Sequence, residues 1–227
     1  MSTAGAQLPV PPDGIRVGQL GVVTLRRVII GDLAATLVDL SIRRLLRVEE
    51  HDGEPGEWLV SPLHASAPRH RRESLLGYER ILLDGLSRDG TAASLASLAP
   101  GMPGVLQRTR AALVHDAVHR GWLQRLHHDQ RTDAGEQLAI RIRSFQHGLR
   151  EVASEQGADA LTGPLLPYGL RFGLIRGEEY PLARFAHRWV EIFGELPGWH
   201  VELEPEPRSP LDEPVPMHND GPGWQKW

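Results

Sequence analysis

Two histidines and an aspartate in the middle of the chain have the spacing of metal ligands. His115, Asp116 and His119 form the segment HDAVH, which has aspartate where the HExxH segment of zinc hydrolases has glutamate. Histidines four residues apart on a helix can bind zinc together, but a catalytic site also needs a third ligand and a base. The spacing dictates neither, although His127 and His128 follow nearby. We therefore expect no metal and no other cofactor.

The helix that carries this segment is a better candidate for a partner-binding surface. Residues 102–120 predict a long helix that ends before Gly121. Helical spacing places Leu113, Val114, Ala117, Val118 and Trp122 towards the core. The flanking face holds Arg108, Ala112, His115, Asp116 and His119, which we predict to contact a partner.

Other catalytic patterns are missing from the sequence. The chain has no cysteine, which excludes thiol catalysis and cysteine-ligated zinc or iron–sulfur sites. It also has no phosphate-binding glycine loop, no dinucleotide fingerprint and no nucleophile elbow. We therefore predict that the protein is not an enzyme.

The elements before the long helix predict a first winged-helix-like unit. A helical stripe follows Asp32, which we expect to be its N-cap. Its outward face is predicted to be Ala35, Thr36, Asp39 and Arg43. Residues 45–50 and 58–62 flank a turn-rich segment and predict a β-hairpin.

The same plan recurs further along the chain. Helical segments at 75–86, 91–99 and 102–120 precede a second wing at 122–131. A shift of 77 residues lays Ala35 on Ala112 and Asp39 on Asp116, as an internal duplication would. We expect tandem winged-helix-like units.

The last third of the chain predicts further helices. Asp133 and Glu136 suggest a capping box, followed by Leu138, Ile142, Phe145 and Leu149 at helical spacing. Tyr168 and Phe172 are expected in the core, and the last helix should turn Leu182, Phe185, Trp189, Val190 and Phe193 inward. The predicted fold class is mainly α with short β-hairpins (α+β), tandem winged-helix-like units and a helical C-terminal region.

This pattern divides the chain into six parts. They are a flexible arm (1–14), a first unit (15–63), a linker (64–74), a second unit (75–132), a helical region (133–200) and a tail (201–227). The tail holds six acidic residues and six prolines in 27 positions, a composition typical of segments without a core. Trp224 and Trp227 at its end are either incidental or part of a short acidic-aromatic docking segment, and we predict that they contact a partner.

Charge is distributed unevenly along the 227 residues. The net charge of −4 divides into −2 for residues 1–60, +5 for residues 61–150 and −7 for residues 151–227. The N-terminus lacks the features of a signal peptide, and no apolar run approaches the ~20 residues that span a bilayer. We expect a soluble cytoplasmic protein without direct membrane insertion.

Several segments in a shared order resemble one known family. They are DLAATLVDLSIRRLLRVEE, YERILLDGL, RGWL, TDAGEQLAIRIRSFQHGLRE, LLPYGLRFGL and ARFAHRWVEIFGELPGW. Together they are similar to the cytoplasmic C-terminal region of the DUF2207 family of predicted bacterial membrane proteins, over residues 11–199. The resemblance implies a winged-helix-like body with a helical C-terminal part and carries over no catalytic residues. The membrane segments of that family are not found in this sequence.

These observations lead to two functional hypotheses. The first is a non-catalytic adaptor or accessory subunit that binds a protein or peptide, in a bacterial complex such as one that modifies peptides. The alternative is a winged-helix DNA-binding regulator whose Arg108-bearing helix enters the major groove. The aspartates on both predicted helix faces, Asp39 and Asp116, favour the adaptor because phosphates demand a basic surface.

Overall fold

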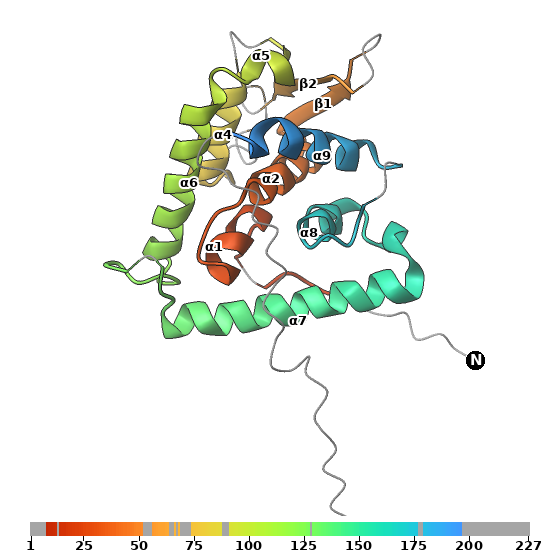
Figure 1. Ribbon diagram of the computed structural model, residues 1–227. Coiled ribbons are helices and arrows are strands. Elements are labelled where there is room, and N and C mark those ends of the chain that lie inside the picture. The colour runs from red at the N-terminus through yellow and green to blue at the C-terminus, as the bar shows by residue number, and fades with distance from the viewer. Residues whose placement is uncertain are drawn as a thin grey trace, which may run out of the picture.

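Helices dominate the molecule, and a small antiparallel sheet lies at one end (Figure 1). The computed structural model describes residues 8–12, 14–51, 56–63, 66, 68, 74–87, 91–127, 129–176 and 179–196. Its elements are η1 (Val17–Gln19), α1 (Leu20–Thr24), α2 (Ile30–Ile42), β1 (Leu46–Glu50), β2 (Trp58–Pro62), α4 (Gly77–Leu86), β3 (Ala93–Ser94), α5 (Leu95–Leu98), α6 (Met102–His119), α7 (Asp133–Gln156), η2 (Ala158–Ala160), η3 (Gly163–Leu165), α8 (Leu166–Arg171) and α9 (Pro181–Gly194). This mixture agrees with the predicted α+β class.

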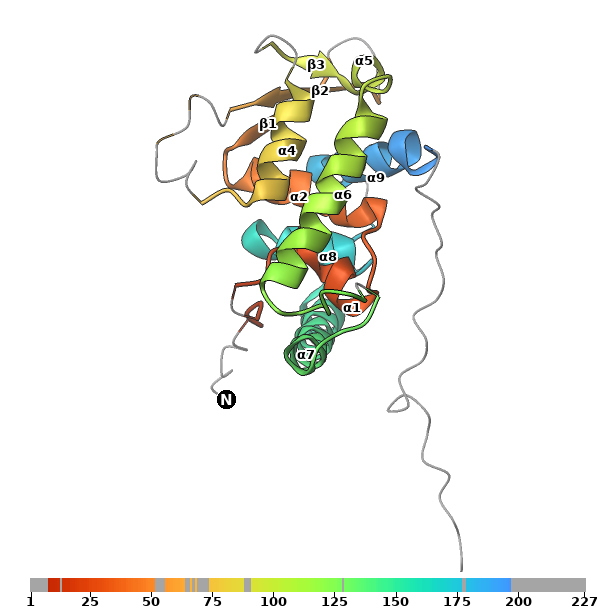
Figure 2. The same cartoon turned by 90° about the vertical axis from the view of Figure 1, so that its left-hand side faces the viewer.

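Helix α2 is the centre of the fold, with η1, α8 and α9 packed around it (Figures 1 and 2). Its predicted outward face is wrong, since Ala35 and Thr36 are each only 1% exposed. Asp39 and Arg43 are half-buried, and Arg43 forms ion pairs with Asp39 and with the buried Glu79. The charged side chains in and next to α2 are paired within the fold, so they do not mark an outward face.

The start of α2 also differs from the prediction. The N-cap is Ile29, and Asp32 lies in the first turn, where its carboxylate accepts a hydrogen bond from the Ile29 N–H at 2.9 Å. The carboxylate accepts a second bond from the Gly21 N–H at 3.2 Å and forms an ion pair with Arg171 of α8. Burial raises the pKa of this carboxyl, and the Arg171 guanidinium and the two N–H groups oppose that shift.

The sheet joins segments that the sequence assigned to two units. The predicted hairpin is confirmed, with β1 antiparallel to β2 and Val48 opposite Val60. The third strand, β3, belongs to the predicted second unit, yet it pairs with β2 of the first. In this pairing Ala93 lies opposite Val60. The predicted second wing contains one isolated antiparallel bridge, between Leu123 and Arg131.

Helices α4 and α6 pack closely against each other, and α4 also contacts β2. A Cβ atom at Gly85 would lie 2.3 Å from a methyl group of Val105, so a larger residue in α4 would push the two helices apart. Figure 2 shows α6 standing in front of α2, with α7 seen nearly end-on below it. One face of α6 therefore packs inward, and the opposite face is left to other contacts.

The C-terminal helices complete the core. The N-cap of α7 is Thr132, whose hydroxyl accepts a hydrogen bond from the Gly135 N–H at 3.1 Å, so the prediction of Asp133 is wrong by one residue. The predicted inward residues Leu138, Ile142, Phe145 and Leu149 are buried, which confirms that pattern. Tyr168 is also buried and packs edge-on against Phe145, with 5.3 Å between ring centroids, while Phe172 is half-buried.

Aromatic residues attach α9 to the sheet end of the molecule. Trp58 of β2 contacts Phe185, which contacts Trp189, and Trp189 packs on Phe193 with 4.2 Å between ring centroids. Phe185, Trp189 and Phe193 are buried as predicted, and Leu182 and Val190 are half-buried. One cluster of buried side chains extends from Ile15 to Phe193, so both predicted units and the C-terminal helices contribute to it.

Candidate functional site

Helix α6 is turned about its axis relative to the prediction. The side chains that it buries are Met102, Val105, Leu106, Thr109, Leu113 and Ala117. Val114 and Val118, which were expected in the core, are only half-buried. Asp116 is also half-buried, and its carboxylate accepts a hydrogen bond from the buried side chain of Gln19 in η1.

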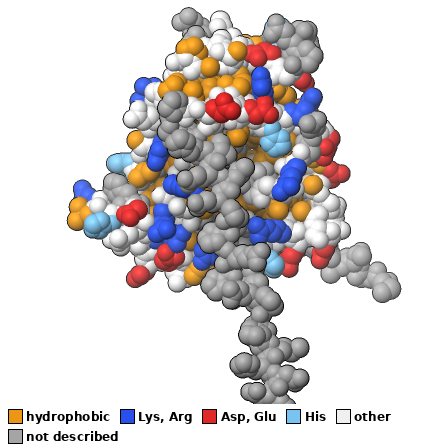
Figure 3. Space-filling view, in the orientation of Figure 1, with side chains coloured by type: hydrophobic (Ala, Val, Ile, Leu, Met, Phe, Trp, Pro, Cys, Tyr) orange, Lys and Arg blue, Asp and Glu red, His pale blue; other side chains and the backbone are white. Residues whose placement is uncertain are grey.

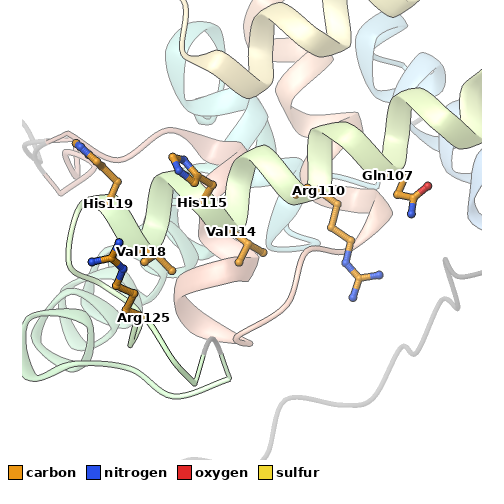
Figure 4. A pocket seen from close by; sticks show the side chains of 8 residues that line it. Gln107, Arg110, Val114, His115, Val118, His119 and Arg125 are labelled. Carbon is orange, nitrogen blue, oxygen red and sulfur yellow. The ribbon is translucent and has the colours of Figure 1, made fainter.

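The outward side of α6 borders a hollow on the surface (Figure 4). We call its lining the α6 face, which consists of Gln107, Arg110, Ala111, Val114, His115, Val118, His119 and Arg125. Figure 4 shows Val114 and Val118 in succession along the helix, with His115 and His119 beside them and Arg125 near Val118. Seven of the eight residues come from α6, so a single rigid helix positions almost the whole site.

The chemistry of the α6 face combines an apolar strip with cationic edges. Ala111, Val114 and Val118 recur at helical spacing and form the strip. Arg110 and the neighbouring Arg108 are exposed, and neither has a carboxylate partner within the described ranges. A ligand that offers both carboxylates and apolar groups matches this arrangement.

Of the five α6 residues predicted to contact a partner, two line the hollow and three do not. His115 and His119 are exposed and belong to the α6 face. Arg108 is exposed outside the lining, and Ala112 is half-buried. Sequence reasoning missed the strip, although Ala111, Val114 and Val118 form a second set of apolar positions on a helix that already had one.

Asp116 has a structural role that the sequence did not reveal. Its carboxylate accepts a hydrogen bond from the side-chain amide of Gln19, a fully buried residue of η1. It also pairs with Arg120 Nε at 2.9 Å. The Arg120 guanidinium lies 5.1 Å from the ring centroid of Trp122, so the end of α6 is held to η1 and to the following loop. Asp116 therefore belongs to the fold and does not face a partner freely.

We expect the substitution Asp116→Ala to destabilise the protein by about 1–3 kcal/mol, because the buried Gln19 amide would lose its acceptor. The neighbouring substitution His115→Ala removes an exposed side chain and should change the free energy of unfolding by less than about 0.5 kcal/mol. Urea denaturation of both variants measures the difference. Equal effects of the two substitutions would show that the contact with Gln19 contributes nothing to stability.

The loop after α6 extends the same surface. Arg131 anchors the loop to α1, since its guanidinium donates to the carbonyl oxygens of Val23 at 2.6 Å and Thr24 at 2.5 Å. The tip carries Leu126, which is 89% exposed and follows Arg125 of the α6 face. In Figure 3 the loop projects at the left edge, where hydrophobic, arginine and histidine side chains lie together. Leu126 therefore adds one exposed apolar side chain next to Arg125 of the α6 face.

The HDAVH segment does not assemble a metal site from the residues that the structure describes. Within those ranges, no three histidine, aspartate or glutamate side chains come together. Asp116 is engaged by Gln19 and Arg120, while His115 and His119 remain on the outer surface. His128, one of the two loop histidines, lies outside the described residues.

The tail tryptophans Trp224 and Trp227 also lie outside the described residues, so their predicted role stays a prediction. None of the helices in the described part of the chain has both the length and the hydropathy to cross a membrane. In comparisons with models of protein families, with curated proteins and with solved structures, no match to the chain was found.

Proposed function

We propose that the protein is a non-catalytic adaptor or accessory subunit that binds a protein or peptide partner through the α6 face and Leu126. The observation that carries the proposal is the strip of Ala111, Val114 and Val118 on the outer side of α6, edged by arginines. Apolar side chains set among cations favour a partner segment that carries both apolar anchors and carboxylates.

The mode of binding follows from the shape of this surface. A strip along one helix, with a loop at its end, suits a short extended or helical segment that lies parallel to α6. The apolar anchors of the segment would cover the strip, and its carboxylates would pair with Arg108 and Arg110. Binding of this kind leaves the partner chemically unchanged, as expected of an accessory subunit in a bacterial peptide-modifying complex.

We also propose that the architecture is a tandem of winged-helix-like units. In this interpretation α2 with the β1–β2 hairpin forms one unit, and α4, β3, α5, α6 and the loop 122–131 form the other. The shift of 77 residues between α2 and α6 and the resemblance to the DUF2207 family support the proposal. Long helices followed by a wing are the parts of such units that commonly meet a partner.

A winged-helix DNA-binding regulator is the second candidate. The exposed Arg108 and Arg110 on α6 favour it, since a recognition helix carries cations to phosphates. The apolar strip and Leu126 favour a protein partner instead, because phosphates give apolar side chains nothing to bind. Binding to duplex DNA should therefore be weak and should disappear at moderate salt.

Affinity capture from the native host tests the proposed function. We expect the tagged full chain to retain a partner that is lost from the double variant Arg110→Glu/Ala111→Glu, because three units of negative charge enter the α6 face. The matched control is Arg143→Glu/Ser144→Glu, which makes the same charge change at exposed positions of α7. Equal loss from both variants would contradict a specific role for α6. Sequence-specific DNA binding that survives physiological salt would favour the regulator.

A further inference from the structure

The α6 face has a covered counterpart within the same molecule. Under the shift of 77 residues, Ala111 and Val114 correspond to Ala34 and Leu37 of α2. Ala34 is 3% exposed and Leu37 is fully buried, in a helix against which α8 and α9 pack. The equivalent side of α6 has exposed or half-buried residues instead. The described helices therefore cover this face of α2, whereas they leave the corresponding face of α6 open.

A segment of the chain itself has the chemistry to cover the α6 face. Residues 201–227 hold six acidic side chains and two basic ones, so this segment has a net charge of −4. It also holds Leu203, Leu211, Trp224 and Trp227 as apolar anchors. Carboxylates interspersed with large apolar side chains complement a strip of alanine and valine that is edged by Arg108 and Arg110.

The chain leaves the described part of the molecule within reach of this surface. Helix α9 contacts α5, and Figure 1 shows its C-terminal half on the side where α6 lies. The residues that follow position 196 can extend by about 3.3 Å each, or roughly 100 Å in total. Helix α6 has 18 residues, which corresponds to a length of about 27 Å. The tail is therefore long enough to run along the whole α6 face.

We propose that the acidic tail, residues 201–227, binds the α6 face of its own molecule and competes there with the external partner. The carboxylates of residues 202–213 pair with the arginines, and apolar tail residues cover Ala111, Val114 and Val118. This inference rests on the proposed function, because it assigns an internal competitor to the same surface. A partner must then displace the tail, so the tail lowers the apparent affinity of the protein for that partner.

Paramagnetic relaxation enhancement in the full chain tests the contact. Because the chain has no cysteine, Ser209→Cys gives a single site for a nitroxide label. We expect the label to broaden the amide signals of α6 residues 107–118 much more than those of α7 residues 140–147. The broadening should decrease as salt rises from about 0.05 to about 0.5 M, because the charge pairs would be screened.

Two variants make the result specific. Arg110→Glu/Ala111→Glu should remove the broadening of α6, whereas Arg143→Glu/Ser144→Glu on α7 should preserve it. Broadening that is absent at low salt, or equal on both helices, would overturn the proposal. A mixed sample tests whether the contact is intermolecular: one copy carries the nitroxide, and the other carries the isotope label without a nitroxide. If the α6 signals of the isotope-labelled copy are broadened to the same extent, the tail binds a second molecule and the proposal is overturned.

The consequence for the partner is measured separately. The full chain with Glu202→Gln, Glu204→Gln and Glu206→Gln should capture the partner with about threefold to tenfold higher affinity, since the competitor would be weakened. Unchanged affinity despite tail broadening would contradict the competition. Loss of the partner from the α6 variant without any tail contact would overturn this inference and leave the proposed function intact. A tail contact without any captured partner would support the contact between the tail and α6 and would contradict the proposed function.

Discussion

Replacing Asp32 by asparagine should cost about 3–5 kcal/mol of the free energy of unfolding, the largest loss expected from any exchange of one polar group here. The side chain of Asp32 is completely buried and forms an ion pair with Arg171, whose side chain is 12% exposed. Asparagine keeps the size of the residue but leaves the guanidinium without its counter-charge. Chemical denaturation of the variant measures the loss.

A second substitution separates the charge from the packing. The double variant Asp32→Asn/Arg171→Met should recover part of the loss, because no unpaired charge stays buried. Glu191→Gln is the matched control, since it neutralises one carboxylate of an exposed ion pair with Arg188 and should change stability by less than about 0.5 kcal/mol. If Asp32→Asn were as mild as Glu191→Gln, the ion pair would have no role in joining α8 to α2.

The single variant Arg171→Met should show a characteristic pH dependence. Burial raises the pKa of the Asp32 carboxyl in the folded protein, and the variant removes the guanidinium that opposes the shift. The folded state then binds a proton more tightly than the unfolded state. Stability is accordingly retained below the ordinary carboxyl pKa and lost as the pH rises above it. The deficit relative to wild type should be larger near about pH 7 than near about pH 4.

The second large effect is expected at Trp189 of α9. Substitution by alanine should lower the free energy of unfolding by about 3–5 kcal/mol, because a fully buried aromatic side chain leaves a cavity. Trp189 contacts Phe185 and Phe193, and its helix packs on α2, so the cavity would lie where the C-terminal helices join the centre of the fold. Thermal and chemical denaturation both measure this loss.

Two further variants give the comparison for Trp189. Its indole N–H is buried and has no hydrogen-bond acceptor within the described residues, so Trp189→Phe removes an unsatisfied donor together with part of the volume. We expect that variant to lose less than about 2 kcal/mol. The adjacent Arg188→Ala changes an exposed side chain and should be nearly neutral. Similar stabilities for all three variants would mean that α9 is not part of the cooperative core.

The elements that follow directly from local sequence were predicted well. Residues 45–50 and 58–62 form the expected hairpin, and the apolar positions of α7 are buried as expected. Such patterns are local, because the spacing of apolar residues alone identifies the buried side of a strand or an amphipathic helix. The cap of α7 was misplaced by one residue because Thr132 and Asp133 are both good caps and only the contact with the Gly135 N–H distinguishes them.

The orientation of two helices could not be predicted from the sequence, and the error in α6 concerns the candidate site. In α2 the polar residues Asp39 and Arg43 suggested an outward face, but Arg43 binds the buried Glu79 of a distant helix. In α6 Asp116 suggested an outward face, but its partner is Gln19, which lies 97 residues earlier. Polar residues that are paired over long range in the fold look identical, in the sequence, to residues that face solvent.

The candidate site was therefore found only in part. His115 and His119 were correctly placed on the outer surface of α6. Val114 and Val118 were assigned to the core; they are half-buried and pack against it, but they also line the hollow. Either apolar set of α6 could have faced inward, and its packing against α4, α1 and η1 selects the set that includes Val105.

Site-specific photo-crosslinking tests the central claim, that the outer side of α6 binds a partner, most directly. A benzophenone amino acid at Ala111 of α6, in the full chain expressed in the native host, should form a covalent product with a partner protein. The same group at Ser144 of α7, which is also exposed, should not form it. A product that forms from Ser144 and not from Ala111 would contradict the account.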